Sequence, residues 1–210
     1  SWLLGVAMLA PISIFFIFCG FRIWEPAAPD LYELITIITS AIISACLIGL
    51  IEETLFRGLL QSQLTATINS FWAVIIVSII YSSVHFLQAP NFDPSQTIHW
   101  YSGFTLLSSA FANFSNTIAF LDAWIALLLA GLFLSLVRLR TNNILWCIGI
   151  HAGWVTHIKV FKEFTDRDNS AQCGRLASNY DNFIGEFSTA WILLILFAWT
   201  FLRYRKFLNR

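Results

Sequence analysis

Six long apolar runs constrain what this chain can fold into. They cover Trp2–Trp24, Leu31–Leu64, Phe71–Leu87, Trp124–Val137, Ile144–Ile158 and Trp191–Leu202, of which the fourth and sixth need their flanks to reach spanning length. A helix that crosses a bilayer needs about 20 mostly apolar residues. Charged residues make up only 11% of the chain, less than half of the roughly 25% that is usual in a soluble domain. The sequence therefore predicts an all-α, polytopic integral membrane bundle with about six transmembrane helices.

The connections between the runs predict a single domain over residues 1–210. Glu25–Asp30 and Ala89–Gln96 each contain two prolines, which mark loops. Residues 97–121 mix aromatic side chains with Ser and Asn and contain no basic residue, so we expect a re-entrant or interfacial segment there. Because the chain begins with Ser1, we also expect further sequence before it.

Basic residues predict which helix ends face the cytoplasm. The connector RLRTNN from Arg138 and the C-terminal RYRKFLNR are two spans apart, so they lie on one side, together with the turn near Asn69. Residues 89–121, without Lys or Arg, then lie on the other side, as the positive-inside rule expects. The loop 161–186 also falls outside, and its basic residues are mixed with acidic ones.

Net charge and cysteine spacing narrow the function classes. The formal net charge is zero and no basic, aromatic-interleaved patch occurs, so there is no electrostatic case for a nucleic-acid partner. Three of the four cysteines lie in apolar runs and none forms a CxxC pair. We therefore expect neither a disulfide framework nor a zinc ribbon.

Two glutamates and an arginine interrupt the second run, in LIEETLFRG (Leu50–Gly58). A charged carboxylate within hydrocarbon costs roughly 2.5–3.5 kcal/mol, so such residues normally face the bundle interior and serve a function. Glu53 and Arg57 are four residues apart, share a helix face and should pair. Glu52 points about 100° away from that face. Its apolar neighbours disfavour the charged form, which suits a carboxyl group that acts as general base and then as general acid.

Two histidines in apolar runs are the expected partners of Glu52. His85 lies 33 residues later, and the chain turns midway between them, so both residues should reach the same depth on adjacent antiparallel helices. His151 lies between Gly149 and Gly153, a small-xxx-small pattern that allows close helix packing. The three groups can polarise a water molecule that attacks a peptide carbonyl. The same three groups can alternatively bind a divalent metal such as zinc.

Three motifs follow one another between Cys46 and His157. They are EETLFR, YSSVH and HAGWV. In this order they resemble the EExxxR, aromatic-xxx-His and His-xxx-Asn/Asp motifs of the CAAX-protease and bacteriocin-processing family of intramembrane endopeptidases. Tyr81 stands where Phe is usual in the second motif, and Val155 stands where the third has Asn or Asp.

The resemblance implies an intramembrane CAAX-type endopeptidase, of glutamate or metallo type, in which Glu52, His85 and His151 are catalytic. Glu53, Arg57 and Tyr81 would then be supporting residues. Family members have been described both with and without a metal. We expect that this chain requires no cofactor. A metal, if present, would bind Glu52, His85 and His151. The resemblance also implies that the Asn of the third motif helps to stabilise the oxyanion that forms on the substrate carbonyl. Since Val155 cannot donate a hydrogen bond, we expect His151 to stabilise this oxyanion, alone or together with Thr156 or a backbone N–H.

The expected partners are the lipid bilayer and a membrane-anchored protein or peptide substrate, and the expected location is a bacterial cytoplasmic (inner) membrane. Two other functions remain open from the sequence. One is a proton- or ion-coupled transporter that uses the same three groups as a relay, although we find no internal repeat of the kind common in transporters. The other is an inactive family member that acts as a scaffold or immunity protein, which Val155 would favour.

Overall fold

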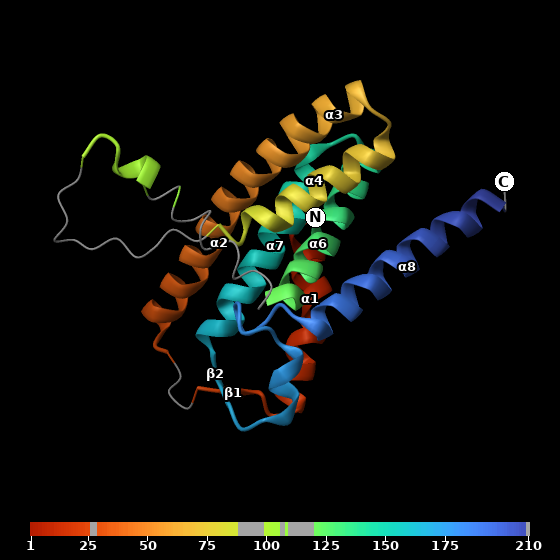
Figure 1. Ribbon diagram of the computed structural model, residues 1–210. Helices are drawn as coiled ribbons and strands as arrows, with labels where there is room; N and C mark the ends of the chain where they lie inside the picture. Colours follow the sequence, from red (N-terminus) through yellow and green to blue (C-terminus); the bar gives the residue numbers. More distant parts are fainter. Residues whose placement is uncertain (26–28, 88–98, 106–107, 109–119, 209–210) are drawn as a thin grey trace.

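The computed structural model describes residues 1–25, 29–87, 99–105, 108 and 120–208. Its elements are, in chain order, α1 (Trp2–Phe18), β1 (Arg22–Trp24), α2 (Leu31–Glu53), the π-helical η1 (Thr54–Leu60), α3 (Gln61–Thr67), α4 (Ser70–Val84), α6 (Leu121–Thr141), α7 (Ile144–Glu163), β2 (Thr165–Arg167), the 3₁₀-helical η3 (Gln172–Leu176) and α8 (Glu186–Leu208) (Figure 1). The interfacial segment predicted at 97–121 lies mostly outside the described residues.

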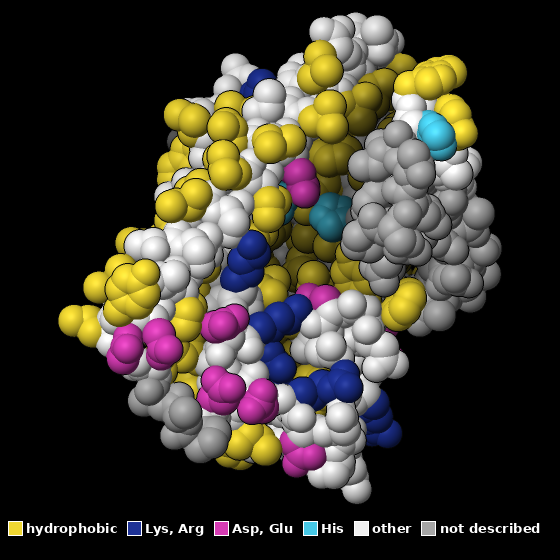
Figure 2. Space-filling model, turned by 90° about the vertical axis from the view of Figure 1, so that its left-hand side faces the viewer, with side chains coloured by type: hydrophobic (Ala, Val, Ile, Leu, Met, Phe, Trp, Pro, Cys, Tyr) yellow, Lys and Arg dark blue, Asp and Glu magenta, His cyan; other side chains and the backbone are white. Residues whose placement is uncertain are grey.

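Apolar helices make up most of the described structure. Three are long enough to cross a membrane, Leu31–Thr67, Leu121–Thr141 and Ile144–Glu163, and three are shorter, Trp2–Phe18, Ser70–Val84 and Glu186–Phe201. They match the six predicted runs in order. Hydrophobic side chains cover much of the face shown in Figure 2, and charged side chains gather toward its lower end. The fold is therefore consistent with a helical membrane protein.

The prediction of an all-α structure missed a small two-stranded ribbon. The first helix ends at Phe18 rather than continuing to Trp24, and Gly20 adopts a left-handed conformation with φ of 75°. The chain then forms β1, which pairs antiparallel with β2, Arg22 opposite Arg167. Each strand has only three residues and depends on a partner far away in the sequence, so neither shows a strand pattern of its own.

The longest helix carries the paired glutamates. α2, η1 and α3 form one continuous helix that begins with a capping box, in which Asp30 Oδ1 accepts from the Glu33 N–H (2.8 Å) and Glu33 Oε2 accepts from the Asp30 N–H (3.1 Å). The π-helical η1 starts directly after Glu53. Such segments are rare and frequently occur at functional sites.

α7 lies between α1 and α2 and packs closely against both. A Cβ atom on Gly49 of α2 would lie only 3.1 Å from the Ile148 carbonyl oxygen of α7. A Cβ atom on Gly153 would lie 2.9 Å from the Val6 nitrogen of α1. The small residues around His151 thus allow close helix packing, as predicted, and α1 is the helix that approaches.

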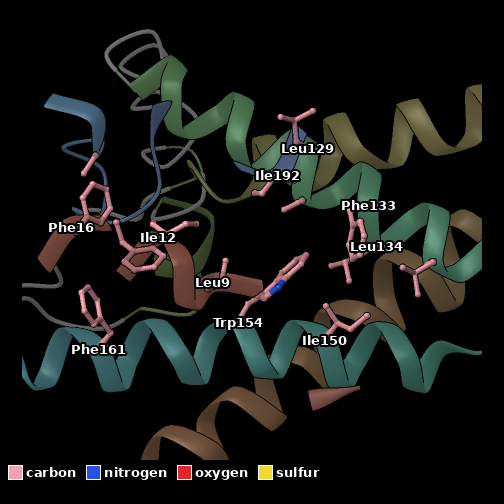
Figure 3. Packing of buried hydrophobic residues seen from close by; sticks show 14 of the residues in the cluster. Leu9, Ile12, Phe16, Leu129, Phe133, Leu134, Ile150, Trp154, Phe161 and Ile192 are labelled. Atoms are coloured by element: carbon pink, nitrogen blue, oxygen red, sulfur yellow. The ribbon is translucent and has the colours of Figure 1, made fainter. Parts of the chain in front are cut away.

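A hydrophobic core holds α7 in place. It joins buried side chains of α1, α6, α7 and α8, including Leu9, Ile12, Phe16, Phe133, Leu134, Ile150, Trp154, Phe161 and Ile192 (Figure 3). Within it, the ring centroids of Phe133 and Trp154 are 5.9 Å apart. This packing surrounds the helix that carries His151 and limits its movement.

A disulfide joins Cys19, at the end of α1, to Cys173 in η3. The prediction of no disulfide is therefore wrong. The two cysteines are 154 residues apart, and no local spacing marks them as partners. The bond ties the loop between α7 and α8 to the end of α1.

Replacing Cys19 with Ser should lower the free energy of unfolding by about 2–4 kcal/mol, because the open chain gains conformational entropy. Thermal unfolding of the purified protein without reductant measures this loss. Cys46→Ser is the matched control, since Cys46 is exposed and unpaired. Equal unfolding temperatures for the two variants would contradict a stabilising role for the bond.

Candidate active site

The structure brings Glu52, His85 and His151 together from three helices. Glu52 lies at the end of α2, His85 caps the end of α4, and His151 lies midway along α7. Glu52 Oε2 is 3.8 Å from His85 Nε2 and 4.0 Å from His151 Nε2. Residues that lie 99 positions apart in the chain (52 to 151) thus lie within 4.0 Å of each other.

One carboxylate oxygen of Glu52 has no hydrogen-bond partner among the described residues. Oε2 makes no hydrogen bond within the described part of the chain, and the side chain is 28% exposed. The distances to the two imidazoles exceed the usual hydrogen-bond range of about 2.7–3.2 Å. A water molecule between the carboxylate and the imidazoles can bridge groups separated in this way.

Both imidazoles are oriented by bonds to their other nitrogen. His85 Nδ1 lies 2.8 Å from the Tyr81 carbonyl oxygen, and His151 Nδ1 lies 2.8 Å from Glu53 Oε1. A carbonyl and a carboxylate only accept hydrogen bonds, so Nδ1 is the donor in each ring. In the neutral ring, Nε2 then carries the lone pair, and both lone pairs face Glu52.

Glu53 and Arg57 form the predicted ion pair. Arg57 donates to Glu53 Oε1 at 2.9 Å, and both side chains are fully buried. Arg57 also donates to the Gly131 carbonyl oxygen (3.1 Å) and lies 4.4 Å from the centre of the Tyr81 ring. The sequence did not show that Glu53 also binds His151, which makes it a positioning residue as well as a structural one.

A cavity of about 310 Å³ adjoins the histidines. Its walls are mostly apolar and come from α1, α6, α7 and α8, and it extends to Tyr180 and Asp181 in the loop before α8. Figure 2 shows histidine side chains recessed in a hollow with hydrophobic walls. The pocket therefore combines a few polar groups with an apolar surround, as enclosed binding sites commonly do.

A comparison with protein-family models identifies the family of this chain. Residues 34–157 match the model described as type II CAAX prenyl endopeptidase Rce1-like. The chain belongs to this family. The match covers all three motifs, Glu52–Arg57, Tyr81–His85 and His151–Val155, and confirms the resemblance seen in the sequence. Searches of curated proteins and of solved structures gave no match.

The pocket of this Rce1-like protein does not fit a metal ion well. Ligand atoms about 2.1 Å from a tetrahedral zinc lie about 3.4 Å from one another, whereas Glu52 Oε2 lies 3.8 and 4.0 Å from the two Nε2 atoms. Within the described ranges, no group of three or more His, Cys, Asp or Glu residues is arranged to hold a metal. Cys147 lies one turn before His151, but its Sγ contacts the Leu134 carbonyl oxygen (3.4 Å).

Thr156 is not free to replace the asparagine of the family motif. Its hydroxyl donates to the Ala152 carbonyl oxygen (2.7 Å) and accepts from Trp2 Nε1 (3.2 Å). Val155, at the motif position itself, lines the cavity with an apolar side chain. Of the polar groups suggested by the sequence, His151 is therefore the best placed to face an oxyanion.

Tyr180 contributes to the site but has no sequence motif. Its hydroxyl donates to the His85 carbonyl oxygen (3.0 Å), and its ring packs on Phe86 with centroids 4.7 Å apart. Burial, and then the negative charge of Asp181, raise the pKa of Tyr180, so the hydroxyl remains a donor. Asp181 in turn pairs with Lys162 of α7 at 3.0 Å. This loop therefore steadies the end of α4.

Replacing Tyr180 with Phe should reduce the rate of peptide hydrolysis by up to about tenfold, since one neutral hydrogen bond contributes about 0.5–1.5 kcal/mol. The loss should appear in kcat rather than KM, because Tyr180 bonds to the backbone of His85 and not to the reacting atoms. Steady-state kinetics measures the two separately. An unchanged kcat would show that the bond does not position His85.

Proposed function

We propose that this Rce1-like protein is an intramembrane endopeptidase that hydrolyses a peptide bond of a membrane-associated protein or peptide with water activated by Glu52. One observation carries the proposal: Glu52 Oε2 has no protein hydrogen-bond partner among the described residues and faces the Nε2 atoms of two oriented histidines within 4.0 Å. The family match and the apolar cavity beside the histidines support it.

The geometry supports a water-based mechanism. A water bound between Glu52 and His85 gives one proton to the carboxylate while its oxygen attacks the carbonyl carbon of the substrate. His151, when protonated at Nε2, donates to the resulting oxyanion. Glu52 then returns the proton to the leaving nitrogen as the C–N bond breaks, which yields a carboxylic acid and an amine. Glu53 holds His151 through Nδ1 during these steps.

No step requires a metal, and we propose that the protein works without one. The proposal rests on the separations around Glu52 Oε2, which suit a shared water better than tetrahedral zinc. Incubation of the active protein with a strong chelator should leave the cleavage rate unchanged. Loss of cleavage that zinc restores would contradict a metal-free site.

The test of the proposed function is a comparison of membrane-protein termini. Cells that contain the wild type, the Glu52→Gln variant or the Glu163→Gln variant are compared for newly formed N- and C-termini. Glu163 is exposed at the end of α7, so it serves as the matched control. Termini present with wild type and with Glu163→Gln but absent with Glu52→Gln would support proteolysis. Identical sets in all three would contradict it.

One observation favours a second candidate, an inactive family member that acts as a scaffold. Val155 replaces the expected asparagine, and Thr156 is engaged elsewhere. In a scaffold, Glu52→Gln should leave function intact. The comparison of termini therefore separates the two candidates.

A further inference from the structure

A second cavity lies between α2 and α7, and we call it the lysine groove. Its volume is about 570 Å³. Besides apolar side chains, α2 lines it with three hydroxyl groups and α7 with three charged groups, which belong to Thr36, Ser40, Ser44, Lys159, Lys162 and Glu163. The groove therefore lies between the same two helices that carry Glu52 and His151.

Lys159 is the cation of this groove that has no carboxylate partner among the described residues. Its Nζ donates to Ser44 Oγ of α2 (2.7 Å), whereas Lys162 pairs with Asp181 (3.0 Å). Long lysine side chains near a helix end usually extend to the aqueous surface, but this one reaches toward α2. An ammonium group has three hydrogens to donate, and Ser44 accepts one of them. The others are available to an acceptor on a ligand.

The acidic side chains near the groove lie beyond Lys159. Glu163 is one helical turn farther from His151 than Lys159 is, and it also lines the next cavity, together with Glu25 and Glu33. Like charges repel one another, so these carboxylates disfavour an anionic ligand group farther out. They lie outside the site that we consider, which is the ammonium group of Lys159 itself.

The Lys159–Ser44 contact lies at a defined distance from the catalytic residues. Lys159 follows His151 by eight residues on α7 (151 to 159), and Ser44 precedes Glu52 by eight residues on α2 (44 to 52). An α-helix rises about 1.5 Å per residue, so each helix places the contact about 12 Å from the catalytic centre. The two estimates agree because α2 and α7 run antiparallel, with Gly49 packed on the α7 backbone between these levels.

One face of α7 connects the catalytic centre with Lys159. Val155 lies four residues from both His151 and Lys159, so the three side chains form a row on that helix. Val155 also lines the apolar cavity beside the histidines. On the face shown in Figure 2, basic side chains lie just below the hollow that contains the histidines. A peptide that extends from this hollow along α7 would therefore reach Lys159.

We propose that Lys159 determines specificity by binding a carboxylate of the substrate about three or four residues from the scissile bond. An extended chain spans at most about 3.3–3.6 Å per residue, so a distance of about 12 Å corresponds to this number of residues. The carboxylate belongs to an acidic side chain or to a chain terminus, since both present the same group. The position relative to the scissile bond rests on the proposed function, whereas the carboxylate site does not.

Peptide binding tests the site without any cleavage. The protein carries Glu52→Gln and is held in discs of zwitterionic lipid. The probes are fluorescent apolar peptides with an amidated C-terminus and a single Glu, and the matched peptides carry Gln at the same position. A third set has no Glu and a free C-terminal carboxylate. Fluorescence anisotropy gives the Kd of each peptide.

We expect the protein with Lys159 to bind a carboxylate-bearing peptide about five- to tenfold more tightly than its neutral match, a gain between those of exposed and of buried charged pairs. The form that is preferred distinguishes an acidic side chain from a terminus. Lys159→Arg should keep the preference, Lys159→Met should abolish it, and Lys159→Glu should reverse it. Arg175→Met removes an exposed cation of η3 outside the groove and should keep the preference.

Two results would overturn the carboxylate site. The first is equal binding of charged and neutral peptides, or a preference that survives Lys159→Met. The second is a preference that disappears in discs with an anionic phospholipid, because a lipid head group would then occupy the site instead of the substrate.

Cleavage by the wild type tests the position of the carboxylate. When the Glu is moved along the peptide, the bond that is cut should move with it and remain about three or four residues away. A cut that stays at one bond wherever the Glu lies would overturn this part of the inference. If the wild type cuts neither these peptides nor any membrane protein, the proposed function fails, while the binding measurements still decide whether Lys159 holds a carboxylate.

Discussion

Replacing Glu52 with Gln is expected to lower kcat for peptide hydrolysis by about 10²–10⁴-fold, the usual contribution of a general acid–base group. The amide has nearly the shape of the carboxyl group but cannot take a proton from water at neutral pH. The fold should persist, because the Glu52 side chain is 28% exposed and its Oε2 accepts no hydrogen bond from the described residues. Kinetics with a cleaved peptide, in detergent or lipid discs, measures the loss.

Two controls make this result interpretable. Glu163→Gln removes a carboxylate of the same size at an exposed helix end and should keep the wild-type kcat. Thermal unfolding of Glu52→Gln should match that of wild type. Proteolysis at the wild-type rate in Glu52→Gln would exclude Glu52 as the base. If the wild type cleaves no peptide but carries a proton-coupled flux, and Glu52→Gln loses that flux, the result would instead favour the transporter in which these residues act as a proton relay.

Replacing Arg57 with Met should destabilise the protein by about 3–5 kcal/mol, the range measured when one partner of a buried ion pair is removed. Glu53 would then be a buried carboxylate with no cation, and the Gly131 carbonyl would lose its donor. The Tyr81 ring would also lose the guanidinium above it. Measurement of the unfolding free energy, or of the unfolding temperature in lipid discs, tests this.

The double variant Glu53→Gln/Arg57→Met separates charge burial from lost packing. A neutral amide at position 53 removes the uncompensated charge, and its oxygen can still accept from His151 Nδ1. The double variant should therefore be more stable than Arg57→Met alone. Arg175→Met, at an exposed position of η3, should change stability by less than about 0.5 kcal/mol. Equal losses in the single and double variants would contradict the argument.

The features that the sequence predicted correctly depend on short separations. The six apolar helices follow from runs of consecutive residues, and the Glu53–Arg57 pair follows from a spacing of four on one helix. The meeting of Glu52 with His85 follows from two helices joined by one tight turn. In each case neighbouring residues restrict the geometry, so the pattern can be read along the chain.

Long-range packing decided the rest. The Cys19–Cys173 bond, the β1–β2 ribbon and the contact of Tyr180 with His85 each join segments that are distant in sequence and have no shared motif. Packing also bears on whether Thr156 or His151 donates to the oxyanion. Trp2 of α1, the helix that lies against α7, donates a hydrogen bond to the Thr156 hydroxyl. The sequence by itself thus determined the membrane helices and the chemistry of their polar residues. Only the tertiary structure decided the partners of those residues, because helix packing determines which side chains meet.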